Sequence, residues 1–388
     1  MNETWWVEET DLDEDQLKVI GLGREGSHMI MGPPGSGKTN LLLLRANYLC
    51  KSDKLNVLIL VFTRPLREFI AAGAEKYLFA PSKVQTYNGW AFSLLAEHGF
   101  KINKMGDFES ERKHLIEQLG ILIANEKITD DYYDAILLDE AHDYLVDEIK
   151  IIRQFTKIFF SVSDIRQQIY RKGSETIDYL KKITDTIKLR YHYRTGIQIC
   201  RLADNIMKGK RSYIPLEPTA HYNESLRPSS VKIFRCSSIE EQCNHIVSEI
   251  ETQLEAYPEE MLGIMCPRHE ELEKIKEFMG RSSLKKLCIY QDNASGYTPF
   301  HKNRPICVST LHGAKGLEFR AVHIAACDTL ARFYKTNRNL IFTGVTRAKT
   351  SLSLYYCGNL YGYLESAIAN LSPRQDVPKI SEAFGKDS

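Results

Sequence analysis

Short apolar runs, each about the length of a β-strand, recur along the first half of the chain between stretches of mixed character. The run at residues 56–62 (NVLILVF) is apolar at nearly every position, which is typical of a strand buried on both faces of a parallel sheet. Similar patterns predict strands at residues 27–31, 83–86, 134–138 and 157–162. Because helical stretches separate them, the region from 27 to 170 is expected to form one parallel, doubly wound α/β domain.

The same alternation continues in the second half. Strands are expected at residues 186–189, 231–234, 261–265, 305–310, 321–326 and 351–356, with helices between them. This half contains no second glycine-rich phosphate loop, so we expect a second α/β domain that does not bind phosphate by the same device. The boundary between the domains is predicted near residue 187.

A glycine-rich stretch follows the first expected strand and matches the pattern G-x-x-x-x-G-K-[ST]. Its residues are Gly32, Pro33, Pro34, Gly35, Ser36, Gly37, Lys38 and Thr39. Glycines let several backbone N–H groups turn toward one anion, and the N-terminus of the following helix adds partial positive charge. Lys38 would bind the β- and γ-phosphates and Thr39 would bind Mg²⁺, so the stretch predicts a nucleoside triphosphate site.

Two acidic residues, Asp139 and Glu140, end the apolar run at residues 134–138. Acids at the carboxyl end of a buried strand are what the metal and water sites of a phosphate-loop enzyme need. Asp139 would hold Mg²⁺, and Glu140 would act as general base toward the attacking water. An acidic helix start is the alternative structural explanation for the pair.

The composition of the 388-residue chain, with 43% hydrophobic and 26% charged residues, is that of an ordinary globular protein. The apolar runs are far shorter than a membrane span, and the acidic N-terminus does not resemble a signal peptide, so a cytoplasmic protein without membrane contact is expected. The nine cysteines form no C-x-x-C pair, which favours reduced thiols over a zinc site. With a net charge of +1, any nucleic-acid surface must be local, and each basic stretch could equally be a solvated helix face.

Several motifs occur in an order that resembles superfamily 1 helicases of the UvrD/Rep/PcrA type, and the resemblance extends over nearly the whole chain. The first half contains GPPGSGKT (32–39), VFTRPL (61–66), TYNGW (86–90), LLDEAHD (137–143) and SVSDIRQQIY (161–170). The second half contains LRYHYRT (189–195), STLHGAKGLEF (309–319) and TGVTRAK (343–349). The letters DEAH at 139–142 also name a group of superfamily 2 RNA helicases, but the arginine-rich motif of that group is absent from this sequence.

The resemblance assigns further residues to ATP. In chain order they are Gln16, Gln167, Tyr193, Arg194, Gly316, Glu318 and Arg347. Asn40 is also expected to contact the nucleotide, although close relatives often have at its position an arginine that helps hold the base. Gln16 and Tyr193 would contact adenine, and Glu318 would contact the ribose. Arg194 would reach the γ-phosphate from the second domain, and so would Arg347, which matches the family's arginine finger. Both contacts require that ATP binding closes the cleft between the domains.

The motif that contains Gln167, the expected γ-phosphate sensor, departs from the family after Tyr170. Arg171 and Lys172 follow where relatives carry an aromatic residue that stacks on a base. His142 also stands where relatives have glutamine. The residues expected to contact nucleic acid are Phe62, Thr63, Arg64, Thr86, Tyr87, Trp90, Thr310 and His312, of which the three aromatic residues could instead belong to the core.

Relatives insert accessory domains, called 1B and 2B, before the LLDEAHD and STLHGAKGLEF motifs, and the spacing here implies that both are absent or vestigial. The resemblance therefore implies two tandem RecA-like P-loop NTPase domains, residues 1–187 and 188–388, with ATP and Mg²⁺ in the cleft. The expected activity is 3′→5′ translocation on single-stranded DNA, in repair or anti-phage defence, with a nuclease or another protein subunit as partner. Two alternatives stay open: an ATP-gated module that binds nucleic acid or a partner protein without travelling, and an RNA-directed helicase.

Overall fold

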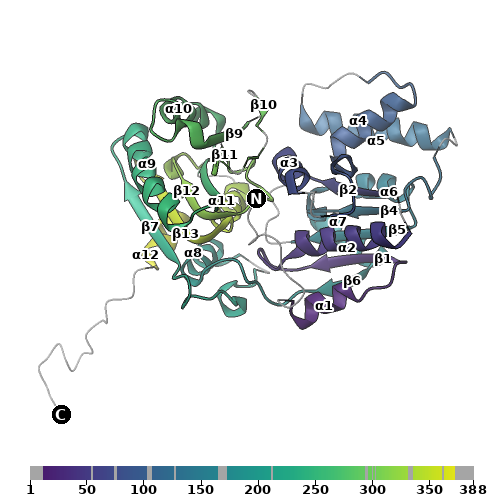
Figure 1. Ribbon diagram of the computed structural model, residues 1–388, viewed down its shortest axis with the longest axis horizontal. Helices are drawn as coiled ribbons and strands as arrows, with labels where there is room; N and C mark the ends of the chain where they lie inside the picture. Colours follow the sequence, from purple (N-terminus) through teal and green to yellow (C-terminus); the bar gives the residue numbers. More distant parts are fainter. Residues whose placement is uncertain are drawn as a thin grey trace, which may run out of the picture.

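The computed structural model describes residues 12–53, 56–73, 77–102, 107–125, 128–164, 173–210, 213–292, 296–298, 300–301, 303–330, 335–360 and 362–371. These residues form two α/β domains that lie side by side, each built on one central sheet (Figure 1). The predicted fold class, two RecA-like domains with parallel sheets, is confirmed. Within the described ranges, no helix has the length and apolar character needed to cross a membrane.

The first sheet has six parallel strands in the order β3-β2-β4-β5-β1-β6. They are β1 (Ser27–Met31), β2 (Val57–Val61), β3 (Val84–Thr86), β4 (Ala135–Leu138), β5 (Ile158–Ser163) and β6 (Asp185–Lys188). The helices of this domain are α1 (Glu14–Ile20), α2 (Lys38–Asp53), α3 (Arg64–Gly73), α4 (Tyr87–Glu97), α5 (Phe108–Ala124), α6 (Val146–Arg153) and α7 (Gly173–Ile183).

Successive side chains of this sheet enter two separate cores. Leu58 and Leu60 of β2 pack with α4, α5, α6 and α7. Their neighbours Val57 and Ile59 pack with α2 and α3 on the opposite face. Helices thus cover both faces, which explains why every residue of β2 and β4 is buried and why these strands appear in the sequence as unbroken apolar runs.

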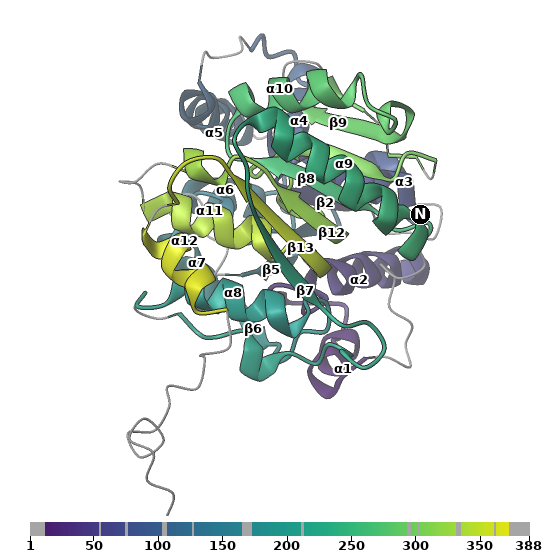
Figure 2. The same cartoon turned by 90° about the vertical axis from the view of Figure 1, so that its left-hand side faces the viewer.

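The second sheet has seven strands in the order β10-β9-β11-β8-β12-β13-β7, all parallel except β10. They are β7 (Ser230–Arg235), β8 (Leu262–Cys266), β9 (Cys288–Asp292), β10 (Gly296–Tyr297), β11 (Ile306–Thr310), β12 (Phe319–Ile324) and β13 (Ala348–Tyr356). Helices α9 (Ile239–Ala256) and α10 (His269–Met279) share one core of this sheet. Helices α8 (Ile197–Met207), α11 (Lys335–Val345) and α12 (Gly362–Ala369) share the other and form a separate group (Figure 2).

The strand predicted at residues 186–189 belongs to the first domain, not to the second. It is β6, which pairs with β1 from His28↔Asp185 to Met31↔Lys188. Local apolar pattern does not specify a pairing partner, so this assignment needed the tertiary structure. The first sheet therefore ends at Lys188, and residues 189–195 carry the chain into the second domain. Strands β9 and β10 are additions that the sequence pattern did not predict.

The described chain between β3 and β4 contains two helices, α4 and α5, at the place where relatives are expected to insert the first accessory domain. The two helices contact each other and project beside the first sheet (Figure 1). Leu94 of α4 and Leu115 of α5 both belong to the core of that sheet. This segment is therefore an integral part of the first domain.

Candidate nucleotide site and nucleic-acid groove

The phosphate loop joins β1 to α2 at the carboxyl edge of the first sheet. Gly35 and Gly37 have φ angles of 80° and 81°, in the left-handed region that residues with a Cβ disfavour. The ammonium group of Lys38 donates to the carbonyl oxygens of Gly32 and Pro33 at 2.9 and 2.8 Å. Lys38 thus lies across the concave side of the loop, where a phosphate would be surrounded by its backbone.

Gln16 connects α1 to the phosphate loop. Its side-chain oxygen accepts a hydrogen bond from the backbone of Asp13 at 3.0 Å, and its amide nitrogen donates to the carbonyl oxygen of Ser36 at 3.1 Å. Ser36 in turn donates from its hydroxyl to the carbonyl oxygen of Pro33 at 2.9 Å, and Pro34 beside it is buried. The oxygen of the Gln16 side chain therefore caps α1 while its amide nitrogen holds the loop, and its contact with adenine stays a prediction.

Thr39 and Asp139 lie together as the predicted metal site requires. The Thr39 hydroxyl donates to a carboxylate oxygen of Asp139 at 3.1 Å. Burial and the adjacent Glu140 carboxylate raise the pKa of Asp139 to about 7. Hydroxyl and carboxylate oxygens are the hard ligands that Mg²⁺ prefers, so these two side chains fit the ion by the chemistry of their donor atoms.

Glu140 is held in an uncommon backbone conformation. Its φ and ψ angles are 49° and 44°, the left-handed region, and its side chain is buried. Such a conformation in a non-glycine residue costs on the order of 1–3 kcal/mol and is concentrated at functional sites. Burial opposes ionisation, but His142, Lys315 and Lys38 lower the pKa of Glu140 to about 2. The carboxylate is therefore charged at neutral pH and can accept a proton from water.

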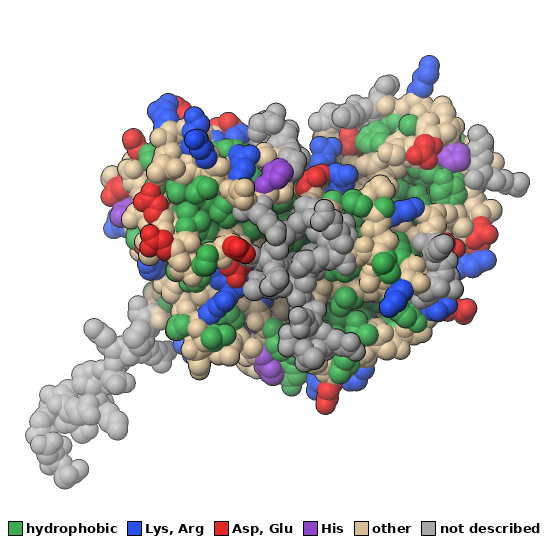
Figure 3. All heavy atoms as spheres, viewed as in Figure 1, with side chains coloured by type: hydrophobic (Ala, Val, Ile, Leu, Met, Phe, Trp, Pro, Cys, Tyr) green, Lys and Arg blue, Asp and Glu red, His purple; other side chains and the backbone are tan. Residues whose placement is uncertain are grey.

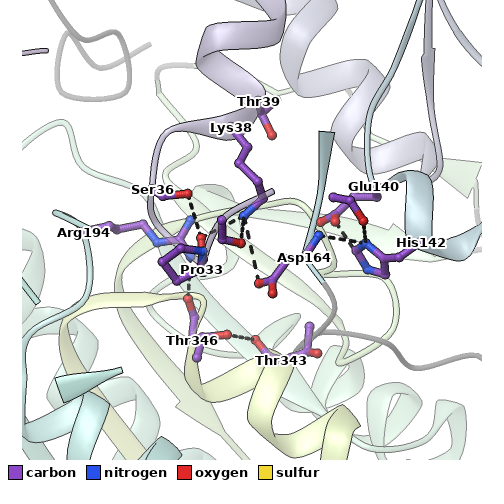
Figure 4. Close-up of polar contacts among 12 residues, drawn as sticks. Pro33, Ser36, Lys38, Thr39, Glu140, His142, Asp164, Arg194, Thr343 and Thr346 are labelled. Atoms are coloured by element: carbon purple, nitrogen blue, oxygen red, sulfur yellow. Dashed lines mark hydrogen bonds and ion pairs between the residues drawn. The ribbon is translucent and has the colours of Figure 1, made fainter. Parts of the chain in front are cut away.

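Arg194 reaches the phosphate loop from the segment that follows β6. A Cβ added to Gly35 would lie 2.9 Å from the Cβ of Arg194, so glycine is needed for this close approach. The Arg194 guanidinium pairs with Glu318 and donates to the carbonyl oxygen of Thr346 at 2.9 Å. Figure 4 shows Arg194 beside the loop, with Lys38 between it and Glu140.

Arg347, the predicted arginine finger, is buried near the same glutamate. Its guanidinium donates to the carbonyl oxygens of Thr343 and Leu317 at 3.1 and 3.2 Å. Burial and the neighbouring Arg194 lower the pKa of Arg347 to about 10. The positive charge of Arg347 also contributes to the low pKa of Glu140, which places a second-domain cation in the electrostatic field of the first-domain acid.

Two predicted nucleotide contacts lie at this site but have protein partners. The backbone N–H of Tyr193 donates to the carbonyl oxygen of Gly35 at 3.2 Å, and its hydroxyl donates to Asp13. Glu318 pairs with Arg194 and lies 3.6 Å from the ammonium nitrogen of Lys349. The proposed contacts of Tyr193 with adenine and of Glu318 with ribose stay predictions.

Three further residues were predicted to contact the nucleotide: Gly316, Asn40 and Gln167. Gly316 has a φ of 84°, and a Cβ there would lie 2.7 Å from Leu66 of α3, so it forms a close contact between the two domains. Asn40 is buried in the first turn of α2. Gln167 lies outside the described residues.

His142 is the centre of a buried polar network that the sequence motifs did not predict. Its Nδ1 accepts a hydrogen bond from the backbone N–H of Asp164 at 3.1 Å, while its Nε2 lies 3.5 Å from the Glu140 carboxylate. The ammonium nitrogen of Lys315, from the second domain, lies 3.2 Å from the same Nε2 and pairs with Asp143. Burial and Lys315 lower the pKa of His142 to about 3, so the imidazole is neutral. The network connects Glu140 to both domains, and Figure 4 shows the contacts of His142 with Glu140 and Asp164.

A groove of about 580 Å³ runs between the two domains beside this network. Seven of the eight residues expected to contact nucleic acid line it: Phe62, Thr63, Arg64, Thr86, Tyr87, Thr310 and His312. The Thr63 hydroxyl donates to the carbonyl oxygen of Lys315 at 3.1 Å, so one wall of the groove touches the buried network. The face drawn in Figure 3 mixes basic and acidic side chains, in keeping with the net charge of +1.

Trp90, the eighth residue, lies in the core instead. It is 1% exposed, and its ring centroid lies 5.2 Å from that of Phe155. Its indole N–H donates to the hydroxyl of Tyr133 at 3.1 Å. Helix α4 turns this side chain toward the sheet, which is incompatible with stacking on a base and agrees with the core alternative.

Comparison with known proteins gives one family match. Residues 305–355 match the UvrD-like helicase C-terminal domain, a segment that contains β11, β12, α11 and Arg347. No curated protein is significantly similar to the chain. Among solved structures, the C-terminal domain of a possible DNA helicase from Lactobacillus plantarum WCFS1 aligns at 18% identity over 46% of this chain and 96% of that one, with a TM-score of 0.34. The family match covers residues 305–355, which form part of the second domain.

Proposed function

We propose that this chain is a nucleic-acid-dependent ATPase that translocates 3′→5′ along single-stranded DNA. The observation that carries the proposal is the meeting of Lys38, Asp139 and Glu140 of the first domain with Arg194 and Arg347 at one buried site. A groove lined by both domains lies next to that site. The match of residues 305–355 to a UvrD-like helicase domain supports the same proposal.

In the proposed reaction, each side chain has one task. Lys38 and the loop N–H groups bind the phosphates, and Thr39 and Asp139 would hold Mg²⁺, which would neutralise charge on the phosphate oxygens. Glu140 accepts a proton from the attacking water. Arg194 and Arg347 stabilise the negative charge that develops as the γ-phosphate leaves.

Movement along a strand would follow because the proposed nucleotide site and the groove each contain residues from both domains. ATP draws the arginines toward the phosphate loop, and loss of the γ-phosphate releases them. The same relative motion would displace the groove residues Thr63 and Arg64 of the first domain against Thr310 and His312 of the second. A strand that contacts both sets would then be moved once per ATP.

The test is steady-state ATP hydrolysis with single-stranded DNA, single-stranded RNA, duplex DNA and no nucleic acid. We expect strong stimulation by single-stranded DNA and loss of stimulated turnover in Lys38→Ala. Stimulation by none of the nucleic acids would overturn the proposal, and stimulation by RNA alone would replace it with the RNA-directed helicase. Displacement of streptavidin from 3′- or 5′-biotinylated DNA measures direction.

A second candidate is an ATP-gated module that grips nucleic acid or a partner protein without travelling. The observation in its favour is the helix pair α4–α5 at the place where relatives are expected to insert a larger domain. DNA-stimulated hydrolysis without streptavidin displacement from either end would support this candidate. The proposed roles in repair or anti-phage defence, and a nuclease subunit as partner, call for purification from the native cell with nuclease assay of the isolated complex.

A further inference from the structure

The first-domain wall of the groove is aromatic, and part of it comes from a helix that no helicase motif covers. Phe62, Tyr87, Phe108 and Tyr144 all line the groove. The Phe62 ring lies edge-on to Phe108 and Tyr144, with centroids 6.3 and 5.5 Å apart. Phe108 is the first residue of α5, and the side chain of its N-cap residue Asp107 accepts a hydrogen bond from the backbone of Ser110 at 2.9 Å. The cap fixes where α5 begins and hence where Phe108 lies.

Phe108 differs from the other aromatic residues of the wall in its exposure. It is 48% exposed, whereas Tyr87 and Tyr144 are 4% and 1% exposed. Among the large apolar side chains that are exposed in the described part of the chain, Phe108 is the one that lines the groove. An exposed phenyl ring in a groove offers a flat apolar surface on which another ring can stack.

Arg112, one turn further along α5, contacts the phenyl rings of both Phe62 and Phe108. Its guanidinium carbon lies 5.7 Å from the ring centroid of Phe62 and 5.4 Å from that of Phe108. Arg112 is 5% exposed, and its guanidinium forms two hydrogen bonds with Glu148 and donates to the carbonyl oxygen of Asp143 at 3.0 Å. Because its charge is matched by Glu148, Arg112 holds the rings in place and is not a phosphate ligand.

Buried polar groups in the same groove point independently to a ligand. The hydroxyls of Tyr87 and Tyr144 and the side-chain oxygen of Gln291 have no hydrogen-bond partner among the described residues. All three residues line the groove, and Gln291 is 2% exposed and lies on the second-domain side. A tyrosine hydroxyl can donate or accept and the amide oxygen accepts, so the three atoms are of the kinds that pair with a nucleobase edge. They are buried behind the groove surface, so a base would satisfy them only after the lining side chains shift.

We propose that Phe108, with Phe62 beside it, is a stacking platform for one unpaired base of the single-stranded DNA in this groove. The assignment rests on the proposed function and adds to it a binding residue from α5. It commits to a single strand because an unpaired base has a free ring face, whereas the bases of a duplex are already stacked on one another.

The first test measures binding of a fluorescent oligothymidine to Phe108→Ala, Phe108→Leu and Phe108→Tyr. Stacking on an aromatic side chain predicts about a 5- to 150-fold loss of affinity for Phe108→Ala. Phe108→Leu keeps an apolar side chain but has no ring, so it should lose nearly as much, while Phe108→Tyr should bind like the wild type. Ile121→Ala is the matched control, because Ile121 is also 48% exposed on α5 and lies outside the groove lining.

The second test removes the base from the DNA instead of the ring from the protein. Wild type and Ile121→Ala should bind an oligonucleotide of abasic sites more weakly than one with bases, and Phe108→Ala should lose most of that preference. A 2-aminopurine probe should be quenched on binding to the wild type and quenched less by Phe108→Ala.

The outcomes separate the platform from the proposed function. If the wild type binds single-stranded DNA and Phe108→Ala matches Ile121→Ala in both tests, the platform is overturned while the proposed function stands. If Phe108→Leu binds like the wild type, stacking is overturned in favour of simple apolar contact. If the wild type binds no single-stranded nucleic acid, both proposals fail.

Discussion

The two domains have similar sheets but present opposite strand ends to the proposed nucleotide site. The first domain uses carboxyl ends, because the phosphate loop follows β1 and Asp139 and Glu140 follow β4. The second domain uses amino ends, because Glu318 directly precedes β12 and Arg347 directly precedes β13. The general rule that ligands bind at the carboxyl edge of a parallel sheet therefore describes only half of this site.

This difference in strand ends accompanies a difference in chemistry. The first domain contributes backbone N–H groups, one lysine and two acids, which in the proposed reaction would bind phosphate and metal. The second contributes guanidinium groups that are buried and already hydrogen-bonded to carbonyl oxygens, such as Arg347 to Thr343 and Leu317. The first domain alone is expected to bind nucleotide, and hydrolysis is expected to need both.

The largest effect should come from Arg347, which tests whether the second domain is needed. Loss of an arginine finger lowers kcat by about 10³- to 10⁵-fold. We expect Arg347→Ala to lose DNA-stimulated hydrolysis to that extent while still binding a fluorescent ATP analogue. Arg281→Ala is the control, since Arg281 is exposed and its guanidinium pairs with the exposed Glu277 of α10. Full activity of Arg347→Ala would show that the two domains do not share one catalytic site.

Glu140→Gln should have the next largest effect and tests the first-domain half. The amide keeps the shape of the side chain but cannot accept the proton from water, which predicts a loss of about 10²- to 10⁴-fold in kcat. Binding of the ATP analogue should be retained. Hydrolysis within tenfold of the wild type would assign the general base to another residue.

Lys315→Met should reduce stability by breaking a pair that joins the two domains. The variant leaves the buried Asp143 carboxylate without its cation, which predicts a loss of about 3–5 kcal/mol in the free energy of unfolding. Urea titration followed by circular dichroism measures this loss. The double variant Lys315→Met/Asp143→Leu removes both charges and should recover much of it, whereas equal stabilities of the single and double variants would contradict the pairing.

The smallest expected effect concerns His323 of β12, which is buried and lies outside the helicase motifs. Its ring nitrogens lie 2.9 Å from the Tyr355 hydroxyl and 2.8 Å from the Gln253 side-chain oxygen, and burial lowers its pKa from 6.5 to about 3. Below pH 6.5 the unfolded chain therefore binds a proton that the folded chain excludes, so stability falls as the pH drops toward 3, by up to about 1.4 kcal/mol per unit.

His323→Gln should remove this dependence. Between pH 6.5 and pH 5, wild type should lose about 2 kcal/mol more than the variant in urea unfolding. His245→Gln, at an exposed histidine of α9, should behave like the wild type. Parallel pH profiles for wild type and His323→Gln would mean that His323 is not held neutral.

How well the sequence predicted the positions of these residues depended on how local each feature is. The phosphate loop is one contiguous stretch whose glycines predict the positive φ angles of its backbone. Asp139 and Glu140 directly follow an apolar run. The groove residues Thr310 and His312 were predicted through motif resemblance, and the structure places them opposite Phe62 and Tyr87. Trp90 belongs to the same motif stretch as Tyr87 but is rotated into the core, because its direction depends on how α4 packs.

The sequence by itself determined the alternation of buried strands and helices, the phosphate loop and the acids beside it, because each depends on residues close together in the chain. Only the tertiary structure decided that β6 pairs with β1, that Lys315 meets His142 across 173 positions of sequence, and that Phe108 of α5 joins Phe62 in the groove. These contacts depend on how strands and helices pack. Such a contact is stabilised by burial and charge neutralisation between segments that are distant in the chain. It therefore has no local signal in the sequence.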